Sequence, residues 1–140
     1  MNKVLLVDDD EMIRYALRSA FEIAGIDVVE KPSGSFVKNP EMLDDIDVVV
    51  ADIFMPDVEG IELITTMNRV APHIPVIAMS GGGRLNSRDY LRTASDLGAA
   101  AVFPKPLNEV QLVDKVCELA AQTHSSKYIR ITWYVHTDGK

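Results

Sequence analysis

The chain has 140 residues, of which 47% are hydrophobic and 25% are charged. This length suits one domain with a core of its own and is too short for two. Twenty-one acidic against fourteen basic residues give a formal net charge of -7. Because that charge repels phosphate backbones and anionic lipid headgroups, we expect no direct binding of nucleic acid and no membrane binding.

The cysteine content and the N-terminal residues bear on the cellular compartment. The single cysteine, Cys117, has no partner for an internal disulfide. The first residues lead into a four-residue apolar run, which is shorter than the apolar segment of a secretion signal. No apolar run approaches the roughly 20 residues that cross a bilayer. We therefore expect a cytoplasmic protein.

Four short apolar runs predict strands. None alternates with polar residues, a pattern typical of parallel strands that are buried on both faces. The runs cover residues 4–7, 48–51, 76–79 and 100–103. A fifth segment, residues 26–30, is more polar and is expected at an edge of the sheet.

Segments with helical periodicity lie between these runs. Their apolar stripes are Ile13, Leu17, Ala20, Phe21 and Ala24, then Ile61, Ile64 and Met67, then Tyr90, Ala94 and Leu97. Gly25 and Gly98 suit the left-handed position just after a helix, and Pro72 ends the remaining helix. Between residues 33 and 45, any helix is expected to be short.

The last predicted helix follows Asn108, a good N-cap, with Gln111 at the capping-box position. Its inward residues are expected to be Val113, Val116, Cys117 and Ala120, so Cys117 is interpreted as a core residue and not a nucleophile. Residues 1–122 are therefore expected to form the domain. Apolar and polar residues then alternate, so residues 123–140 are expected to be a C-terminal tail, with one possible extra strand and no separate domain.

The alternation of strand and helix defines the fold class. It predicts an α/β, doubly wound, five-stranded parallel sheet with helices on both faces. In the flavodoxin-like strand order 2-1-3-4-5, the first and third strands are neighbours.

Polar residues directly follow the apolar runs, at the sheet edge where open α/β sheets bind ligands. These residues are Asp8, Asp9, Asp10, Asp52, Ser80 and Lys105. In the expected strand order, Asp8, Asp9 and Asp52 share one pocket. Carboxylates so close need a compensating cation, and an all-oxygen cluster favours Mg²⁺.

Such a magnesium site is open to a phosphoryl group. Lys105 and Ser80 can each meet a phosphoryl oxygen, while Asp52 is placed to attack phosphorus and form an acyl phosphate. Each residue alone has a simpler interpretation. The aspartates can favour a helix N-terminus, Ser80 and Asp52 can belong to turns, and Lys105 can be an exposed lysine. Their common position at strand ends is what favours a site.

The segments VLLVDDD, VVVADIFMPDVEG, PVIAMSGGG and GAAAVFPKP resemble, in order and spacing, the receiver domain of bacterial two-component response regulators. The resemblance covers residues 3 to about 121. It implies a phosphoacceptor that receives its phosphoryl group from a sensor histidine kinase or a phosphotransfer protein, and that signals to an unknown downstream protein. It implies no enzymatic activity beyond self-directed phosphoryl transfer and autodephosphorylation.

The resemblance also implies residue roles. Asp52 would be the phosphorylated residue, and Asp9, Asp52 and the backbone carbonyl of Phe54 would bind Mg²⁺ directly, with Asp8 acting through water. Ser80 would be the switch hydroxyl, and Lys105 would contact the phosphoryl group. The Lys105–Pro106 peptide bond is expected to be cis. The large side chain of Phe54 is expected to slow loss of the phosphoryl group.

One position departs from the family pattern, and other functions stay open. Val102 replaces the aromatic residue that many receivers carry three positions before the lysine. A magnesium-dependent phosphohydrolase would use Asp52 as nucleophile, but the usual second aspartate is replaced by Phe54. A flavin carrier is disfavoured because the first loop is acidic. The oligomeric state is expected to be a monomer or a weak homodimer.

Overall fold

The computed structural model describes residues 2–33, 35, 39–53, 60–80, 92 and 94–138. Five strands form one parallel sheet with the order β2-β1-β3-β4-β5. Their bounds are β1 Lys3–Val7, β2 Asp27–Lys31, β3 Val48–Asp52, β4 Val76–Ser80 and β5 Ala101–Pro104. The predicted fold class and strand order are confirmed.

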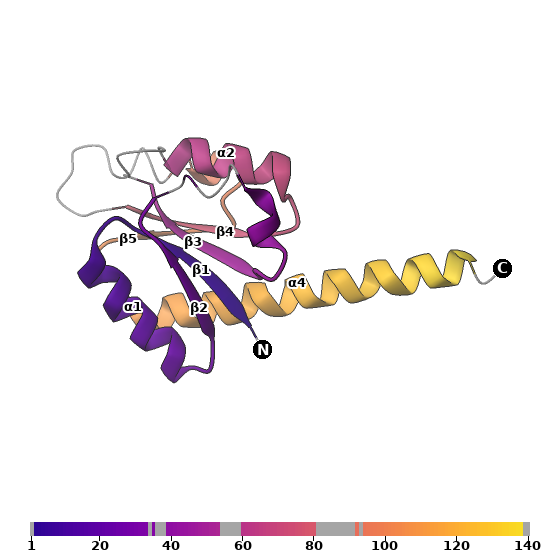
Figure 1. Ribbon diagram of the computed structural model, residues 1–140, viewed down its shortest axis with the longest axis horizontal. Helices are drawn as coiled ribbons and strands as arrows, with labels where there is room; N and C mark the ends of the chain where they lie inside the picture. Colours follow the sequence, from indigo (N-terminus) through magenta and orange to yellow (C-terminus); the bar gives the residue numbers. More distant parts are fainter. Residues whose placement is uncertain are drawn as a thin grey trace.

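Helices cover both faces of the sheet (Figure 1). The helix α2 lies on one face, and α1 and α4 lie together on the other. The bounds are α1 Glu11–Ile23, α2 Gly60–Val70 and α4 Glu109–Asp138, with a short 3-10 helix, η2, at Pro40–Leu43. The helix η2 lies between residues 33 and 45, where any helix was expected to be short, and it has only four residues.

The central strands are apolar throughout because each face packs against helices. Alternate residues of β1 show this, since Leu5 and Val7 belong to the core beneath α2. Val4 and Leu6 belong to the core beneath α1 and α4. All four are fully buried. Burial of such side chains stabilises the fold by about 1.5–3 kcal/mol each.

The helix boundaries follow the sequence signals. Asp10 caps α1, since its Oδ1 accepts hydrogen bonds from the backbone N–H groups of Met12 at 2.9 Å and Ile13 at 3.3 Å. Asn108 caps α4 through the N–H of Gln111 at 3.0 Å. Gly25 has a φ of 80°, a left-handed conformation that only glycine adopts without strain.

The apolar stripes are only partly as predicted. Leu17 and Phe21 of α1 and Ala94 are buried, but Ala24 and Leu97 are exposed. The side chains of Ile61 and Tyr90 lie outside the described residues. Cys117 is half-buried and packs against the core beneath α1 and α4.

Two predictions about strands are wrong. The run at residues 100–103 was expected to be buried on both faces, but β5 is a sheet edge and its residues are half-buried or exposed. The segment at residues 26–30 is an edge strand, β2, as predicted.

The second wrong prediction concerns the tail, residues 123–140. A possible extra strand was expected there, but α4 continues through it to Asp138. The helix α4 continues past the sheet and away from it (Figure 1). Extending an existing helix adds a backbone hydrogen bond for each residue fixed, whereas a new strand needs an unpaired sheet edge within reach. Among the described residues, no helix combines the length and the apolar character required to span a membrane.

Candidate functional site

The acidic residues converge at the carboxyl ends of β1 and β3. These strands are neighbours, and Val7 pairs with Ala51 in their register, so Asp8 and Asp52 come to the same sheet edge. One carboxylate oxygen from each of Asp8, Asp9 and Asp52 lies within 4.8 Å of the others. The predicted convergence of Asp8, Asp9 and Asp52 is therefore present in the structure.

Asp8 is held by its backbone and its side chain. Its N–H continues the β1–β2 pairing by donating to the carbonyl of Lys31 at 3.2 Å. Its carboxylate accepts the N–H of Asp10 at 2.9 Å. Asp8 has no exposed surface and Asp52 is 6% exposed, whereas Asp9 is exposed. The cluster therefore has two buried carboxylates and one that faces solvent.

Lys105 links the two buried carboxylates. Its Nζ lies 2.9 Å from Oδ2 of Asp8 and 3.2 Å from Oδ2 of Asp52. The peptide bond between Lys105 and Pro106 is cis, as predicted. The side chain of Lys105 is 13% exposed, so it is largely shielded from water. This position strengthens its electrostatic contact with both carboxylates.

The pKa values of this cluster reflect burial and charge together. Burial raises the pKa of Asp8 above its ordinary value, although the N–H of Asp10 and the Lys105 ammonium act in the opposite direction. Burial alone would lower the pKa of Lys105, but its contacts with Asp8 and Asp52 outweigh burial and raise that pKa. Lys105 is thus kept as a cation inside the site.

The donor set suits a hard divalent cation. The cluster offers only carboxylate oxygens, and one lysine ammonium pairs with two of its three carboxylates. Mg²⁺ prefers such oxygen ligands and retains several of its waters, which the exposed position of Asp9 would accommodate. The residues present therefore fit a magnesium ion.

Ser80 lies at the end of β4, at the same edge of the sheet. Its residue is 1% exposed, and its hydroxyl oxygen has no hydrogen-bond partner within the described part of the chain. The backbone N–H of Lys105 donates to the carbonyl of Ser80 at 2.8 Å. A buried hydroxyl without a partner is costly, and a bound oxygen-rich group could supply one.

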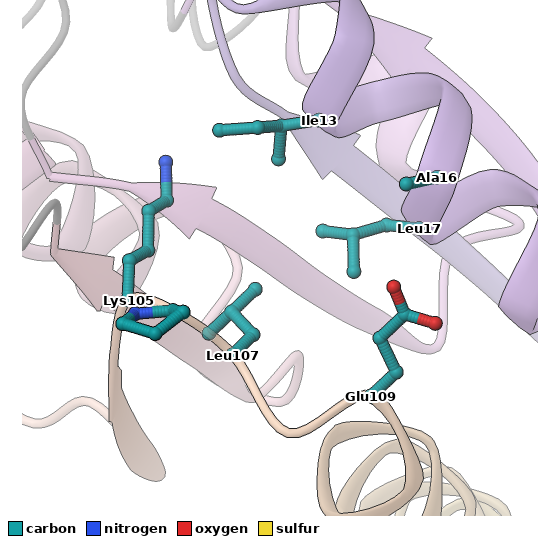
Figure 2. Close-up of a pocket in the computed structure, with 7 residues that line it drawn as sticks. Ile13, Ala16, Leu17, Lys105, Leu107 and Glu109 are labelled. Carbon is teal, nitrogen blue, oxygen red and sulfur yellow. The ribbon is translucent and has the colours of Figure 1, made fainter.

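A mostly apolar cavity of about 330 Å³ lies beside this site (Figure 2). Leu17 and Ile13 of α1 face Leu107 across it, and Lys105 and Glu109 are its charged residues. The Lys105 ammonium is committed to Asp8 and Asp52. The cavity thus lacks a second set of oxygen ligands and is distinct from the acidic cluster.

One part of the predicted site lies outside the described residues. It is Phe54, whose carbonyl was expected to bind Mg²⁺. Sequence reasoning also missed Arg14, which donates a hydrogen bond to the backbone carbonyl of Asp8. The available signal was the spacing between Arg14 and the N-cap Asp10. Residues four apart lie on the same face of a helix, so the long side chain of Arg14 can reach the residues at the start of α1.

Comparisons with known proteins agree with this geometry. Residues 4–117 match the family model described as the response regulator receiver domain. The chain is 32% identical over 128 residues to the transcriptional regulatory protein CpxR of Escherichia coli (strain K12), covering 91% of this chain and 53% of CpxR. It is 36% identical over 114 residues to the C4-dicarboxylate transport transcriptional regulatory protein DctD of Pseudomonas aeruginosa, covering 81% of this chain and 24% of DctD.

Solved structures give the same result. A response regulator receiver domain protein from Clostridium thermocellum superposes with a TM-score of 0.78 at 26% identity, covering 89% of this chain and 98% of that one. The receiver domain of the Francisella response regulator 1452 gives a TM-score of 0.77 at 27% identity, covering 88% and 99%.

The fold, the acidic cluster and these matches define a receiver domain. The chain belongs to the response regulator receiver family of two-component signalling systems. It spans about half the length of CpxR. No comparison supports the magnesium-dependent phosphohydrolase considered as an alternative.

Proposed function

We propose that Asp52 is the phosphoacceptor of this receiver and that a sensor histidine kinase or a phosphotransfer protein supplies the phosphoryl group. The observation that supports this most is the convergence of Asp8, Asp9, Asp52 and Lys105 at one sheet edge. An oxygen of the Asp52 carboxylate attacks phosphorus, and the phosphorus–nitrogen bond to the donor histidine breaks. The imidazole keeps that electron pair and takes a proton from solvent.

Mg²⁺ would be held by Asp9, Asp52 and the carbonyl of Phe54, with Asp8 acting through water. When bound, the ion supplies neutralisation of the negative charge that builds up on the phosphoryl oxygens. Lys105 would move its ammonium from Asp52 toward a phosphoryl oxygen while it keeps Asp8 as a partner. Its present contacts, at 2.9 Å to Asp8 and 3.2 Å to Asp52, support this, because a phosphoryl group on Asp52 would lie within reach of the same ammonium.

Ser80 would couple phosphorylation to a change in conformation. Its buried hydroxyl has no partner in the described part of the chain, so a phosphoryl oxygen at this edge would give it one. That new hydrogen bond would favour the arrangement in which Ser80 lies close to Asp52. The downstream partner would read the resulting shift in population.

The boundaries and partners follow as part of this proposal. Residues 1–122 would form the receiver unit, and residues 123–140 would be its extension and not a separate domain. The net charge of -7 disfavours direct nucleic-acid binding by this chain. The names of CpxR and DctD describe transcriptional regulators, so contact with DNA would belong to other parts of such proteins.

Mass spectrometry after incubation with acetyl phosphate and Mg²⁺ tests the phosphoacceptor. We expect one phosphoryl adduct on the wild-type chain and none on Asp52→Ala. Asp114→Asn, which alters an exposed aspartate of α4, is the matched control and should react like the wild type. An adduct that persists in Asp52→Ala would refute the assignment, and continued turnover of acetyl phosphate without an adduct would favour a phosphohydrolase.

A further inference from the structure

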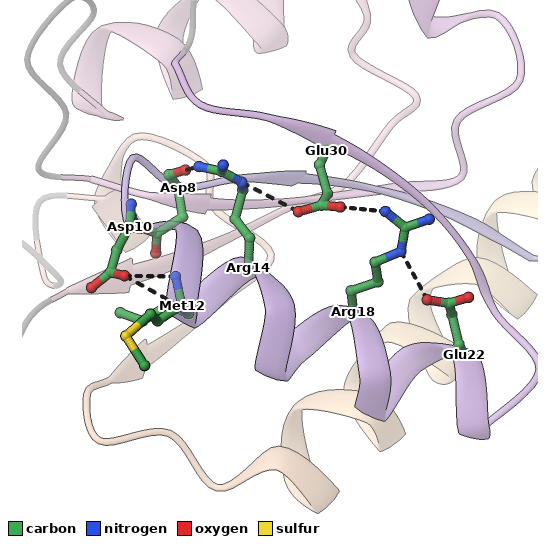
Figure 3. Close-up of polar contacts among 8 residues, drawn as sticks. Asp8, Asp10, Met12, Arg14, Arg18, Glu22 and Glu30 are labelled. Carbon is green, nitrogen blue, oxygen red and sulfur yellow. Dashed lines mark hydrogen bonds and ion pairs between the residues drawn. The ribbon is translucent and has the colours of Figure 1, made fainter.

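A chain of ion pairs on α1 and β2, completed by one hydrogen bond, runs from the surface of α1 to the acidic cluster (Figure 3). Arg18 pairs with Glu22 at 2.8 Å and also with Glu30. Glu30 pairs with Arg14 at 3.2 Å. Arg14 then donates through Nη1 to the backbone carbonyl of Asp8. The last of these contacts reaches the functional site itself.

The carbonyl of Asp8 belongs to the peptide group that contains the nitrogen of Asp9. Its orientation therefore sets the directions in which the chain leaves Asp8 and enters Asp9. Asp8 is fully buried, and a buried carbonyl requires a donor. Arg14 supplies that donor from α1, so it restrains the peptide plane between two residues of the acidic cluster.

Arg14 is suited to this task by its own surroundings. Its side chain is 16% exposed, compared with 47% for Arg18. Its Nε is held by Glu30 while its Nη1 bonds Asp8, so two donors of one rigid guanidinium are fixed together. The more exposed pairs of Arg18 lie further from the cluster and contribute less, since water screens them.

We propose that Arg14, anchored by Glu30, is a positioning residue for the magnesium and phosphoryl site. It acts on the backbone between Asp8 and Asp9, and through it on the placement of their carboxylates. It does not touch the reacting groups. This inference rests on the proposed function. It adds that the site needs residues of α1 and β2, Arg14 and Glu30, as well as the residues at the strand ends.

Magnesium affinity is the first test. Isothermal titration calorimetry with MgCl₂ on the 140-residue chain should show that Arg14→Gln weakens binding by about tenfold, the lower limit for loss of a group that orients metal ligands. Arg18→Gln is the matched control because it breaks surface pairs of the same helix without touching Asp8, and we expect a change within about twofold. Equal affinity of Arg14→Gln and wild type, or equal losses in both variants, would overturn the inference.

Amide hydrogen exchange of the metal-free chain, followed by NMR, is the second test. The N–H of Asp10 is bonded to the Asp8 carboxylate, so we expect it to exchange several-fold faster in Arg14→Gln and at the wild-type rate in Arg18→Gln. If Arg14→Gln does not fold, Glu30→Gln removes the anchor instead and should change both measurements in the same direction.

The two tests separate this inference from the proposed function. If the wild-type chain binds no Mg²⁺, the proposed magnesium site is wrong, and the exchange measurement alone decides the role of Arg14. If the wild type binds Mg²⁺ and forms the Asp52 adduct while Arg14→Gln is unchanged in affinity and exchange, only the positioning role is wrong.

Discussion

Lys105 and Asp8 are 97 positions apart in the sequence, and their side chains form an ion pair of 2.9 Å at the carboxyl ends of the strands. The same ammonium reaches Asp52 at 3.2 Å. One cation from the β5–α4 connection thus holds together the ends of β1 and β3. The charge balance of the site depends on a contact that only the sheet topology can create.

Substitution of Lys105 tests its role in phosphoryl transfer. We expect Lys105→Met to lower the rate of phosphorylation by acetyl phosphate about 100-fold, because removal of one preformed donor to a developing negative charge has an effect of this size. Mg²⁺ affinity should not fall, since a competing cation is removed. Rates are read by mass spectrometry, with Lys115→Met on the half-exposed surface of α4 as control. A wild-type rate in Lys105→Met would contradict the assignment.

The raised pKa of Asp8 predicts a pH dependence of stability in the metal-free protein. Between the ordinary value of 3.8 and the raised value, the native state binds more protons than the unfolded chain. The free energy of unfolding contributed by this group therefore falls as pH rises through that window. Asp8→Asn removes the titration, so the stability of the variant relative to wild type should rise from about pH 3.5 to neutral pH.

Urea unfolding in the presence of a chelator measures this difference at both pH values. Asp114→Asn is the control, because Asp114 is exposed on α4. A stability difference between Asp8→Asn and wild type that stays constant with pH would contradict a raised pKa of Asp8 in the native state.

The buried hydroxyl of Ser80 predicts opposite effects on stability and signalling. Ser80→Ala removes a polar group without a partner in the described chain, so the unphosphorylated protein should be as stable as wild type or more stable by about 1 kcal/mol. Its chemical shifts should change less on phosphorylation of Asp52. NMR spectra with and without acetyl phosphate test this, with Ser95→Ala as an exposed control. If phosphorylation changes the chemical shifts of Ser80→Ala as much as those of the wild type, Ser80 does not take part in the conformational change.

The extended α4 predicts the effect of truncation. Thr123 is buried, and its Oγ1 donates to the carbonyls of Leu119 at 2.9 Å and Asp47 at 3.3 Å. A chain that ends at Thr123 should lose helical circular dichroism signal and keep its cooperative unfolding. Removal of Thr123 as well should cost about 1 kcal/mol. If truncation converts an oligomer into a monomer in solution, the extension mediates self-association. An unchanged helical circular dichroism signal would contradict the helical extension.

Much of the fold was predictable because its cause is local. The unbroken apolar runs at β1, β3 and β4 indicate strands covered on both faces, and helices cover them. Asp10, Asn108 and Gly25 mark helix ends through their own backbone chemistry. The acidic cluster was also predictable, because the residues that follow parallel strands meet at one edge.

Outside the tail, the sequence by itself determined which residues are strands, which are helices and which polar groups follow the strands, because those properties depend on periodicity and on neighbouring residues. Only the tertiary structure decided that the residues of β5 are half-buried or exposed, that the tail continues α4, and that Arg14 reaches the carbonyl of Asp8. The exposure of a strand and the partner of a buried carbonyl depend on what lies beside them in space, whereas the tail continues α4 because each added residue gains a backbone hydrogen bond. Distant residues supply those neighbours, and periodicity along the chain does not record them.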